Sequence, residues 1–301
     1  MPLITGTGIA ELVDLFEQRG VKFYHACQYK DFKSYLRLGG VPSRSLLSQN
    51  QLNYTRFDTD SRDVDNSVWD KVFGNLSDFG APFFSGNDNT ASVPPPFGPI
   101  LLVFNPRVFM EANDIAICLR SAGAENFDRE RESLSSHIDI NNIFRHVDID
   151  SSADSRELSY IKYNSELQQT FGVRNAGSPE ISCSTNTGML SLNYLTNIRV
   201  DPYLFGSIIL FTLVRDRVSS LHGNFNIHVN ERYTSTNTKR EFTSVMVDLL
   251  SKSDVTAHDV LNNVSLPAFI HNYINRVHAY QFNRFAKYLR EGTILDVLNE
   301  L

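Results

Sequence analysis

Cysteine is scarce in this 301-residue chain, which contains only Cys27, Cys118 and Cys183. Three widely separated cysteines cannot build a disulfide framework, and none of them has a partner at the close spacing of a zinc site. We therefore expect three reduced thiols and no bound metal. Cys183 follows Glu180 closely, but no histidine lies near it in sequence, so we interpret it as a small buried thiol and not as a nucleophile.

Long apolar runs are also missing. The longest, "SIILFTLV" at residues 207–214, is far shorter than the roughly 20 residues that cross a bilayer. The first residues place Glu11, Asp14 and Glu17 in an amphipathic pattern, without the basic start and apolar run of a secretory signal. The sequence therefore predicts a cytoplasmic protein without a membrane segment.

Basic charge is not in excess, since 28 Lys and Arg face 34 Asp and Glu and the net charge is -6. A polyanion would have to bind a local basic patch, because the field of the whole molecule does not attract it. Hydrophobic residues make up 42% and charged residues 21% of the chain, which is typical of a soluble globular fold. The length suits one large domain or two ordinary ones.

Hydrophobic spacing predicts alternating helices and strands in the first 45 residues. Apolar residues at helical spacing predict a helix over residues 8–19, ended by Gly20. A strand, "VKFYHA", follows. Asp31 is the expected cap of the next helix, and Gly39 its end.

The rest of the chain predicts an α+β fold. The polar stretch 50–96 reads as a long functional loop with a short helix in "VWDKVFGNLSDFG". "PILLVFNP" predicts a strand buried on both faces, and "DIAICL", "PEISCS" and "NIRVD" predict further strands. We expect a helix over 156–171 and three amphipathic helices after residue 239. The predicted division is a domain of residues 1–235 and a helical extension of residues 236–301.

Two stretches together resemble the DarT-like branch of the ADP-ribosyltransferases. The first is "YHAC", a helix ended by two glycines and then "PSR", and the second is "PEIS" followed by "LSLNYLTNIRV". The resemblance covers residues 23–201 by the order of these pieces. It implies a split mixed sheet around a cleft that binds NAD in a bent conformation, and transfer of ADP-ribose to a base of single-stranded DNA or RNA. Such proteins act as toxins or phage-defence effectors, restrained by an antitoxin or chaperone.

The resemblance also implies site residues. The family's catalytic glutamate falls on Glu180, and its histidine at the end of the first strand falls on His25. A further family histidine corresponds by order to His137. Cys27 stands where the family has a threonine, and a thiol is a poorer hydrogen-bond donor than a hydroxyl.

Arginines are the expected contacts to the pyrophosphate of NAD, because a guanidinium binds phosphate oxygens in a fork. Arg44 is one candidate, with Ser43 as a supporting donor. Arg56, as a catalytic group, and Asp58 are candidates in "RFDTDSRD", where the family's arginine-bearing loop is replaced. The order of the pieces does not single out one arginine.

The chemistry explains these residue types. Cleavage of the bond between nicotinamide and ribose develops an oxocarbenium-like charge, which a carboxylate near the ribose 2-hydroxyl stabilises. The same carboxylate can accept the proton of the attacking base. The alternatives are a solvated strand-edge glutamate at 180, a core histidine at 25 and a surface arginine at 44.

A nucleic-acid target requires aromatic and basic side chains near the site. The candidates are Tyr24, Tyr29, Lys30, Lys33, Arg37, Arg44 and the loop 186–193. The C-terminal stretch around Tyr288 is basic and aromatic as well, and we interpret it as a packed helix, with a nucleic-acid face or a partner-docking surface as alternatives. Alternatives for the whole protein are transfer to a protein side chain, or a non-catalytic module with the same fold.

Overall fold

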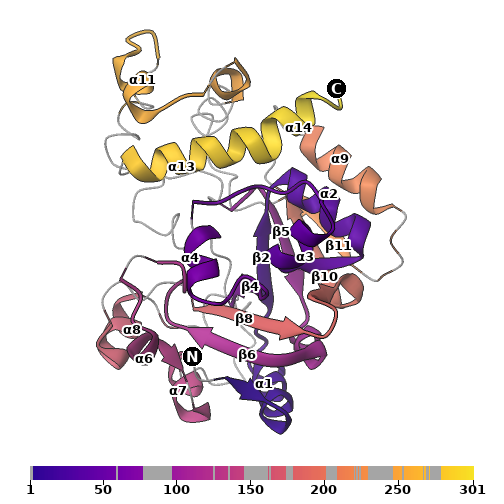
Figure 1. Ribbon diagram of the computed structural model, residues 1–301, viewed down its shortest axis with the longest axis vertical. Coiled ribbons are helices and arrows are strands. Elements are labelled where there is room, and N and C mark those ends of the chain that lie inside the picture. Colours follow the sequence, from indigo (N-terminus) through magenta and orange to yellow (C-terminus); the bar gives the residue numbers. More distant parts are fainter. Residues whose placement is uncertain are drawn as a thin grey trace.

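The computed structural model describes residues 3–58, 60–76, 97–124, 126–134, 136–145, 162, 164–173, 179–200, 209–219, 221, 223, 225–229, 247–252, 254–266, 268, 271 and 279–301. These residues form a mixed α+β structure around one large sheet (Figure 1). Among them, no helix combines the length and the apolar character that a bilayer span requires.

Nine of the described strands make a mixed sheet in the order β1-β6-β8-β4-β2-β5-β10-β11, with β7 paired to β6. Their bounds are β1 Ile4–Thr5, β2 Phe23–Cys27, β4 Val72–Asn75, β5 Ile100–Phe104, β6 Ala112–Cys118, β7 Ser133–Leu134, β8 Glu180–Thr185, β10 Leu195–Val200 and β11 Asn226–Val229. Neighbouring strands are antiparallel, except for the parallel pair β10 and β11. β3 (Gly40–Pro42) and β9 (Met189–Ser191) form a separate small sheet.

The large sheet is split between β2 and β4. These two strands share a single register pair, Tyr24 with Asn75. By contrast, five pairs join β2 to β5 and four join β4 to β8. The strands therefore diverge in the middle of the sheet, and side chains from both halves fill the opening.

Helices cover the ends and faces of this sheet. They are α1 Thr7–Gln18, α2 Tyr29–Leu38, α3 Arg44–Gln49, α4 Asp60–Asp65, α6 Arg129–Glu132, α7 His137–Asn142, α8 Asn164–Phe171, α9 Ile209–Val218, α11 Ala257–Asn262, α13 Ala279–Leu289 and α14 Leu295–Leu298, with 3-10 turns η1 Pro106–Glu111 and η3 Leu192–Tyr194 and a π-helical turn η5 Arg290–Ile294. α13, η5 and α14 run as one rod across the end of the molecule that carries α2, and α1 lies at the opposite end (Figure 1).

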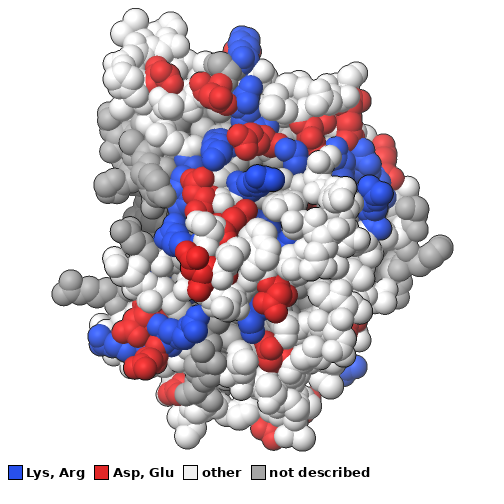
Figure 2. Space-filling view, in the orientation of Figure 1, with Lys and Arg blue, Asp and Glu red and all other residues white. Residues whose placement is uncertain are grey.

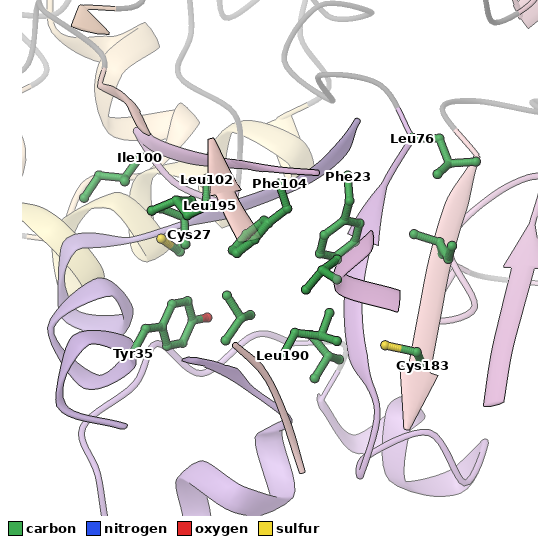
Figure 3. Packing of buried hydrophobic residues seen from close by; sticks show 14 of the residues in the cluster. Phe23, Cys27, Tyr35, Leu76, Ile100, Leu102, Phe104, Cys183, Leu190 and Leu195 are labelled. Carbon is green, nitrogen blue, oxygen red and sulfur yellow. The ribbon is translucent and has the colours of Figure 1, made fainter. Parts of the chain in front are cut away.

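The core is built on β5, whose five residues are at most 4% exposed. Ile100, Leu102 and Phe104 join the main cluster, and Leu101 and Val103 pack with Tyr24 on the other face. Figure 3 shows side chains from both halves of the sheet meeting in the main cluster. The prediction of a strand buried on both faces is confirmed. The helix predicted over residues 8–19 is present as α1, and the helix predicted between Asp31 and Gly39 is present as α2, which begins two residues before Asp31. Gly20 and Gly39 follow these helices with positive φ.

Two local predictions were wrong. "VWDKVFGNLSDFG" contains no helix in its described part, because Val72–Asn75 forms the central strand β4, paired on both sides. Asp31 does not cap α2, which begins at Tyr29 after Gln28; Asp31 is buried in its first turn instead. Residues 156–161 and the predicted domain boundary at 235 lie outside the described residues, and the predicted helix of that region is present from Asn164.

Candidate functional site

A pocket of about 120 Å³ opens where β2 and β4 diverge. β2, α2, α3, α4, β4 and the first residue of β8 all contribute to it. Its lining residues are His25, Ala26, Cys27, Asp31, Tyr35, Pro42, Arg44, Phe57, Asp60, Asp63, Lys71, Phe73, Gly74, Asn75, Phe97, Ser121 and Glu180. Glu180, His25, Cys27 and Arg44, which the sequence singled out, therefore share one pocket although 155 positions separate the first two.

His25 bridges the two halves of the sheet. Its Nδ1 lies 2.6 Å from the carbonyl oxygen of Phe73 in β4 and its Nε2 lies 3.1 Å from the hydroxyl of Tyr35 in α2. A carbonyl can only accept, so Nδ1 carries the proton and Nε2 accepts from Tyr35. Burial lowers the pKa of His25 to about 4, and the nearby Arg44 charge lowers it as well, so the ring is neutral. Both ring nitrogens serve the fold, which leaves the ring face and the backbone for a ligand.

Arg44 is held on several sides at the base of the pocket. Its Nη1 donates to Oδ1 of Asp31 at 3.3 Å, and its guanidinium lies 4.7 Å from the ring centre of Phe57 and 5.2 Å from that of Tyr54. Burial by itself lowers the pKa of Arg44, but the Asp31 carboxylate raises it above its usual range. The guanidinium is therefore a fixed positive charge with N–H donors beyond the one that Asp31 uses.

Asp31 anchors this arginine from a buried position, 1% exposed. Its Oδ1 also accepts from the backbone N–H of Thr55 at 2.9 Å. Among the described residues, Oδ2 has no hydrogen-bond partner. A buried carboxylate is costly unless it is paired, so Asp31 and Arg44 depend on each other.

Glu180 enters the pocket from the first position of β8. Its Oε1 accepts from the backbone N–H of Ala122 at 2.8 Å. Burial raises the pKa of Glu180 from its ordinary 4.5 to about 7, and the charge of Asp63 raises it further, while bonds from Ala122 and Ser121 act in the opposite direction. A carboxyl group that titrates near neutral pH is suited to accept a proton.

α4 adds two more carboxylates, from Asp60 and Asp63, one helical turn apart. Burial raises the pKa of Asp63 to about 6, and the Asp60 charge adds to the effect. Burial also raises the pKa of Asp60, although Arg44 acts against it. The pocket thus holds Arg44 and its partner Asp31 together with three carboxyl groups whose pKa values are raised.

Two glycines allow the backbone segments around the pocket to approach closely. A Cβ on Gly74 would overlap the ring of Phe23, and a Cβ on Gly98, whose φ is +141°, would overlap the backbone of Cys27. Phe97, next to Gly98, packs edge-on against Phe57 at 5.7 Å between ring centres. These contacts place two aromatic rings beside Arg44.

The other predicted site residues lie elsewhere. Ser43 is buried and caps α3 by accepting from the N–H of Leu46. Asp58 pairs with Lys287 and Arg284 of α13 and does not line the pocket. Arg56 is exposed outside the lining. His137 starts α7, 47% exposed, and lies 2.9 Å from Glu11.

The predicted nucleic-acid contacts are partly corrected. Tyr24 and Tyr29 are 1% and 0% exposed, so neither can stack on a base. Lys33 is engaged with Asp296 and Glu300 of the C-terminal segment. Arg37 is exposed. All three cysteines are free, as predicted, and the buried position predicted for Cys183 is confirmed. Burial raises the pKa of Cys183 to about 12, which leaves an unreactive thiol.

Several pocket residues were missed from the sequence. Tyr35 and Lys71 read as ordinary helix and loop residues, and Asp31 read as a cap. Lys71 is 8% exposed and lies 2.6 Å from Asp114 of β6. A usable signal was present only for α4, where the spacing of Asp60 and Asp63 places both on one helix face.

The pocket lining combines Arg44, the rings of Phe57 and Phe97 and the carboxyl group of Glu180. A guanidinium can bind phosphate oxygens, an aromatic ring can pack against a base, and a carboxylate can accept from hydroxyl groups. Among the described residues no cluster of three His, Cys, Asp or Glu side chains has the arrangement of a metal site. No protein-family model matches the chain, and a search of curated proteins finds no match.

Proposed function

We propose that this protein is an NAD-dependent ADP-ribosyltransferase that transfers ADP-ribose to a base in single-stranded nucleic acid. One observation carries the proposal: Glu180, His25 and Arg44, from three distant parts of the chain, line one pocket at the split of a mixed sheet. The resemblance of residues 23–201 to DarT-like enzymes supports the same assignment. NAD is consumed as a co-substrate.

The proposed step exchanges one glycosidic bond for another. The bond between the ribose C1 and nicotinamide breaks, and nicotinamide leaves with the electron pair. A nitrogen or oxygen of the acceptor base forms the new bond to C1, and its proton passes to the Glu180 carboxylate. Ionised Glu180 also stabilises the positive charge that develops on the ribose. Arg44 binds the pyrophosphate and leaves the reacting atoms to the carboxylate.

The state of Glu180 sets the working pH. With a pKa near 7, the carboxylate form is a minor species in acid and the dominant one above neutrality. Bound NAD brings a positively charged nicotinamide ring, which favours the ionised form. We expect the rate to rise with pH through the neutral range and then level off.

A protein acceptor is the second candidate, favoured by the mixed charge of the surface. Figure 2 shows acidic and basic side chains interleaved on the face that it draws. Among the described residues, Lys287 pairs with Asp58 and Lys33 pairs with Glu300. A long electrostatic groove for nucleic acid is thereby disfavoured, and a short contact to one or a few nucleotides is the form that the nucleic-acid proposal takes.

The test follows labelled NAD in the presence of single-stranded DNA, RNA or a protein lysate, each offered separately. Wild type is compared with Glu180→Gln, Arg44→Lys and, as a control, Glu17→Gln, whose carboxylate pairs with Arg107 at the surface. We expect label on one nucleic acid with wild type and the control, and a loss of at least 100-fold with Glu180→Gln, because its loss removes charge stabilisation and the proton acceptor. Label on protein alone would transfer the proposal to the second candidate. A folded wild type that neither binds NAD nor releases nicotinamide would refute both.

A further inference from the structure

The C-terminal segment 279–301 packs against the back of the pocket. It was predicted as an extension of the domain, yet its residues contact those that hold Arg44. α13, η5 and α14 form a rod across this end of the molecule (Figure 1). Two separate series of contacts lead from this rod to the guanidinium of Arg44.

The first series of contacts starts at the π-helical turn η5. Thr293 is fully buried, and its hydroxyl donates to Oε1 of Gln28 at 2.6 Å and accepts from the backbone N–H of Tyr29 at 3.0 Å. These two residues connect β2 to α2. Thr293 therefore fixes the start of the helix whose first turn carries Asp31.

Gly292, the neighbour of Thr293, adds to this first series of contacts. A Cβ at position 292 would lie 2.5 Å from Thr55 Oγ1 and 2.5 Å from Gln28 Cγ, so the two segments touch here without space between them. The N–H of Thr55 donates to Asp31, and Asp31 accepts from Arg44. A π-helical turn is rare and is often found at functional sites. Here it brings Gly292 and Thr293 against Gln28 and Thr55.

The second series of contacts runs through aromatic rings. Tyr288 of α13 is 1% exposed and meets Phe57 edge-on, with 4.6 Å between ring centres. Its hydroxyl accepts from the backbone N–H of Asp58 at 2.8 Å. Phe57 in turn lies under the Arg44 guanidinium at 4.7 Å. The ring of Tyr288 thus sets the position of the ring on which Arg44 rests.

We infer that Tyr288 and Thr293 are positioning residues of the site, which hold Arg44 in place for an anionic ligand through Phe57 and through Gln28, Tyr29 and Asp31. The identity of that ligand as NAD rests on the proposed function. The placement of Arg44 itself does not, so the two can be tested apart. The C-terminal segment thereby supports the binding site through residues that line or adjoin the pocket.

The first experiment observes Arg44 without any ligand. The Nε–Hε signal of Arg44 in a nitrogen-15 correlation spectrum is identified by its disappearance in Arg44→Lys. We expect Thr293→Val and Tyr288→Leu to shift or broaden this signal, and Thr293→Ser, which keeps the hydroxyl, to restore it. Val13→Ala is the matched control, because it opens a cavity at a buried position of α1, which lies at the opposite end of the molecule from α13 (Figure 1).

The second experiment measures NAD affinity in two backgrounds. With Arg44 present, Thr293→Val and Tyr288→Leu should each weaken NAD binding about tenfold, whereas in the Arg44→Lys background they should change it less than about twofold, since coupled residues are not additive. kcat should fall less than KM rises, because Arg44 binds the ground state and the transition state alike.

An unchanged Arg44 signal in both variants, or equal losses of affinity in both backgrounds, overturns the inference. If either variant fails to fold, Tyr288→Phe, which removes the hydroxyl that accepts from the Asp58 N–H next to Phe57, and Thr293→Ser, which keeps its hydroxyl, serve as the folded pair. Tyr288→Phe should move the signal and Thr293→Ser should not. A wild type that binds no NAD refutes the proposed function, and the spectrum still decides the placement of Arg44.

Discussion

Replacing Glu180 by glutamine should stabilise the folded protein above neutral pH while it removes activity. The folded pKa of Glu180, about 7, lies above its ordinary 4.5, because burial disfavours the charged form. The folded state thus binds this proton more tightly than the unfolded chain does. As pH rises from about 4.5 to about 7, the free energy of unfolding falls, and above pH 7 the full cost of the buried charge is present.

The magnitude follows from the two pKa values. At about 1.4 kcal/mol per pKa unit, a rise from 4.5 to about 7 corresponds to at most about 3–4 kcal/mol. The pocket is open to solvent, which screens the charge, so we expect a gain of about 1–3 kcal/mol for Glu180→Gln at pH 8. Glutamine keeps an oxygen that accepts from the Ala122 N–H. At pH 5 both proteins carry a neutral group here, and the gain should shrink below about 1 kcal/mol.

Urea unfolding of wild type and Glu180→Gln at pH 5 and pH 8 measures this difference. Glu132→Gln is the control of opposite sign. Burial alone would raise the pKa of Glu132, but hydrogen bonds from Arg120 hold it below its usual range. Its carboxylate therefore stabilises the fold above pH 4.5, and Glu132→Gln should lose about 1–3 kcal/mol at pH 8. A Glu180→Gln protein no more stable than wild type at pH 8 would refute the account of a destabilising buried charge.

Three further outcomes follow from single contacts. Asp63→Asn removes a charge that raises the pKa of Glu180, so the acid side of the pH–rate profile should move down by roughly half a pH unit; an upward shift would contradict this electrostatic link. Gly98→Ala should destabilise the fold by more than about 3 kcal/mol or prevent soluble expression, because its Cβ would overlap the Cys27 backbone at a φ of +141°. Gly39→Ala, at a φ of +78° with open space around it, should cost only about 1 kcal/mol. Equal shifts of the melting temperature in the two variants would refute the steric explanation. Burial would raise the pKa of Glu300, but hydrogen bonds from Arg217, Lys33 and Tyr29 lower it to about 2. Glu300→Gln should therefore lower the free energy of unfolding by about 1–2 kcal/mol at pH 7, and by progressively less as pH falls from about 4.5 towards 2. Denaturation midpoints across that pH range measure this loss.

Local patterns in the sequence were sufficient for the elements that bury a continuous face. Residues 100–104 form an unbroken apolar run of strand length between prolines, which is typical of a strand buried on both faces. Gly39 ends α2 at a φ of +78°, a conformation that costs glycine nothing. These are properties of a few neighbouring residues, and they read the same in any tertiary context.

The candidate site was only partly predictable. Glu180, His25 and Arg44 could be proposed from the order of short motifs, but their convergence depends on β4, which inserts between β2 and β8. β4 lies in a polar stretch, and Gly74 interrupts its strand pattern, so no local pattern predicted this strand. Strand pairing is decided by non-local contacts, which periodicity does not report.

The sequence by itself determined the α+β class, the three unpaired cysteines, the strand at 100–104 and the short unit in which one helix separates His25 from Arg44. Only the tertiary structure decided what each polar group does. Asp31 is a buried partner of Arg44 and not a cap, and Tyr24 and Tyr29 are core residues. Tyr288 and Thr293, from the far end of the chain, contact Phe57 and Gln28. The physical reason is that the cost of burying a charge or a hydroxyl depends on partners that folding brings from distant positions.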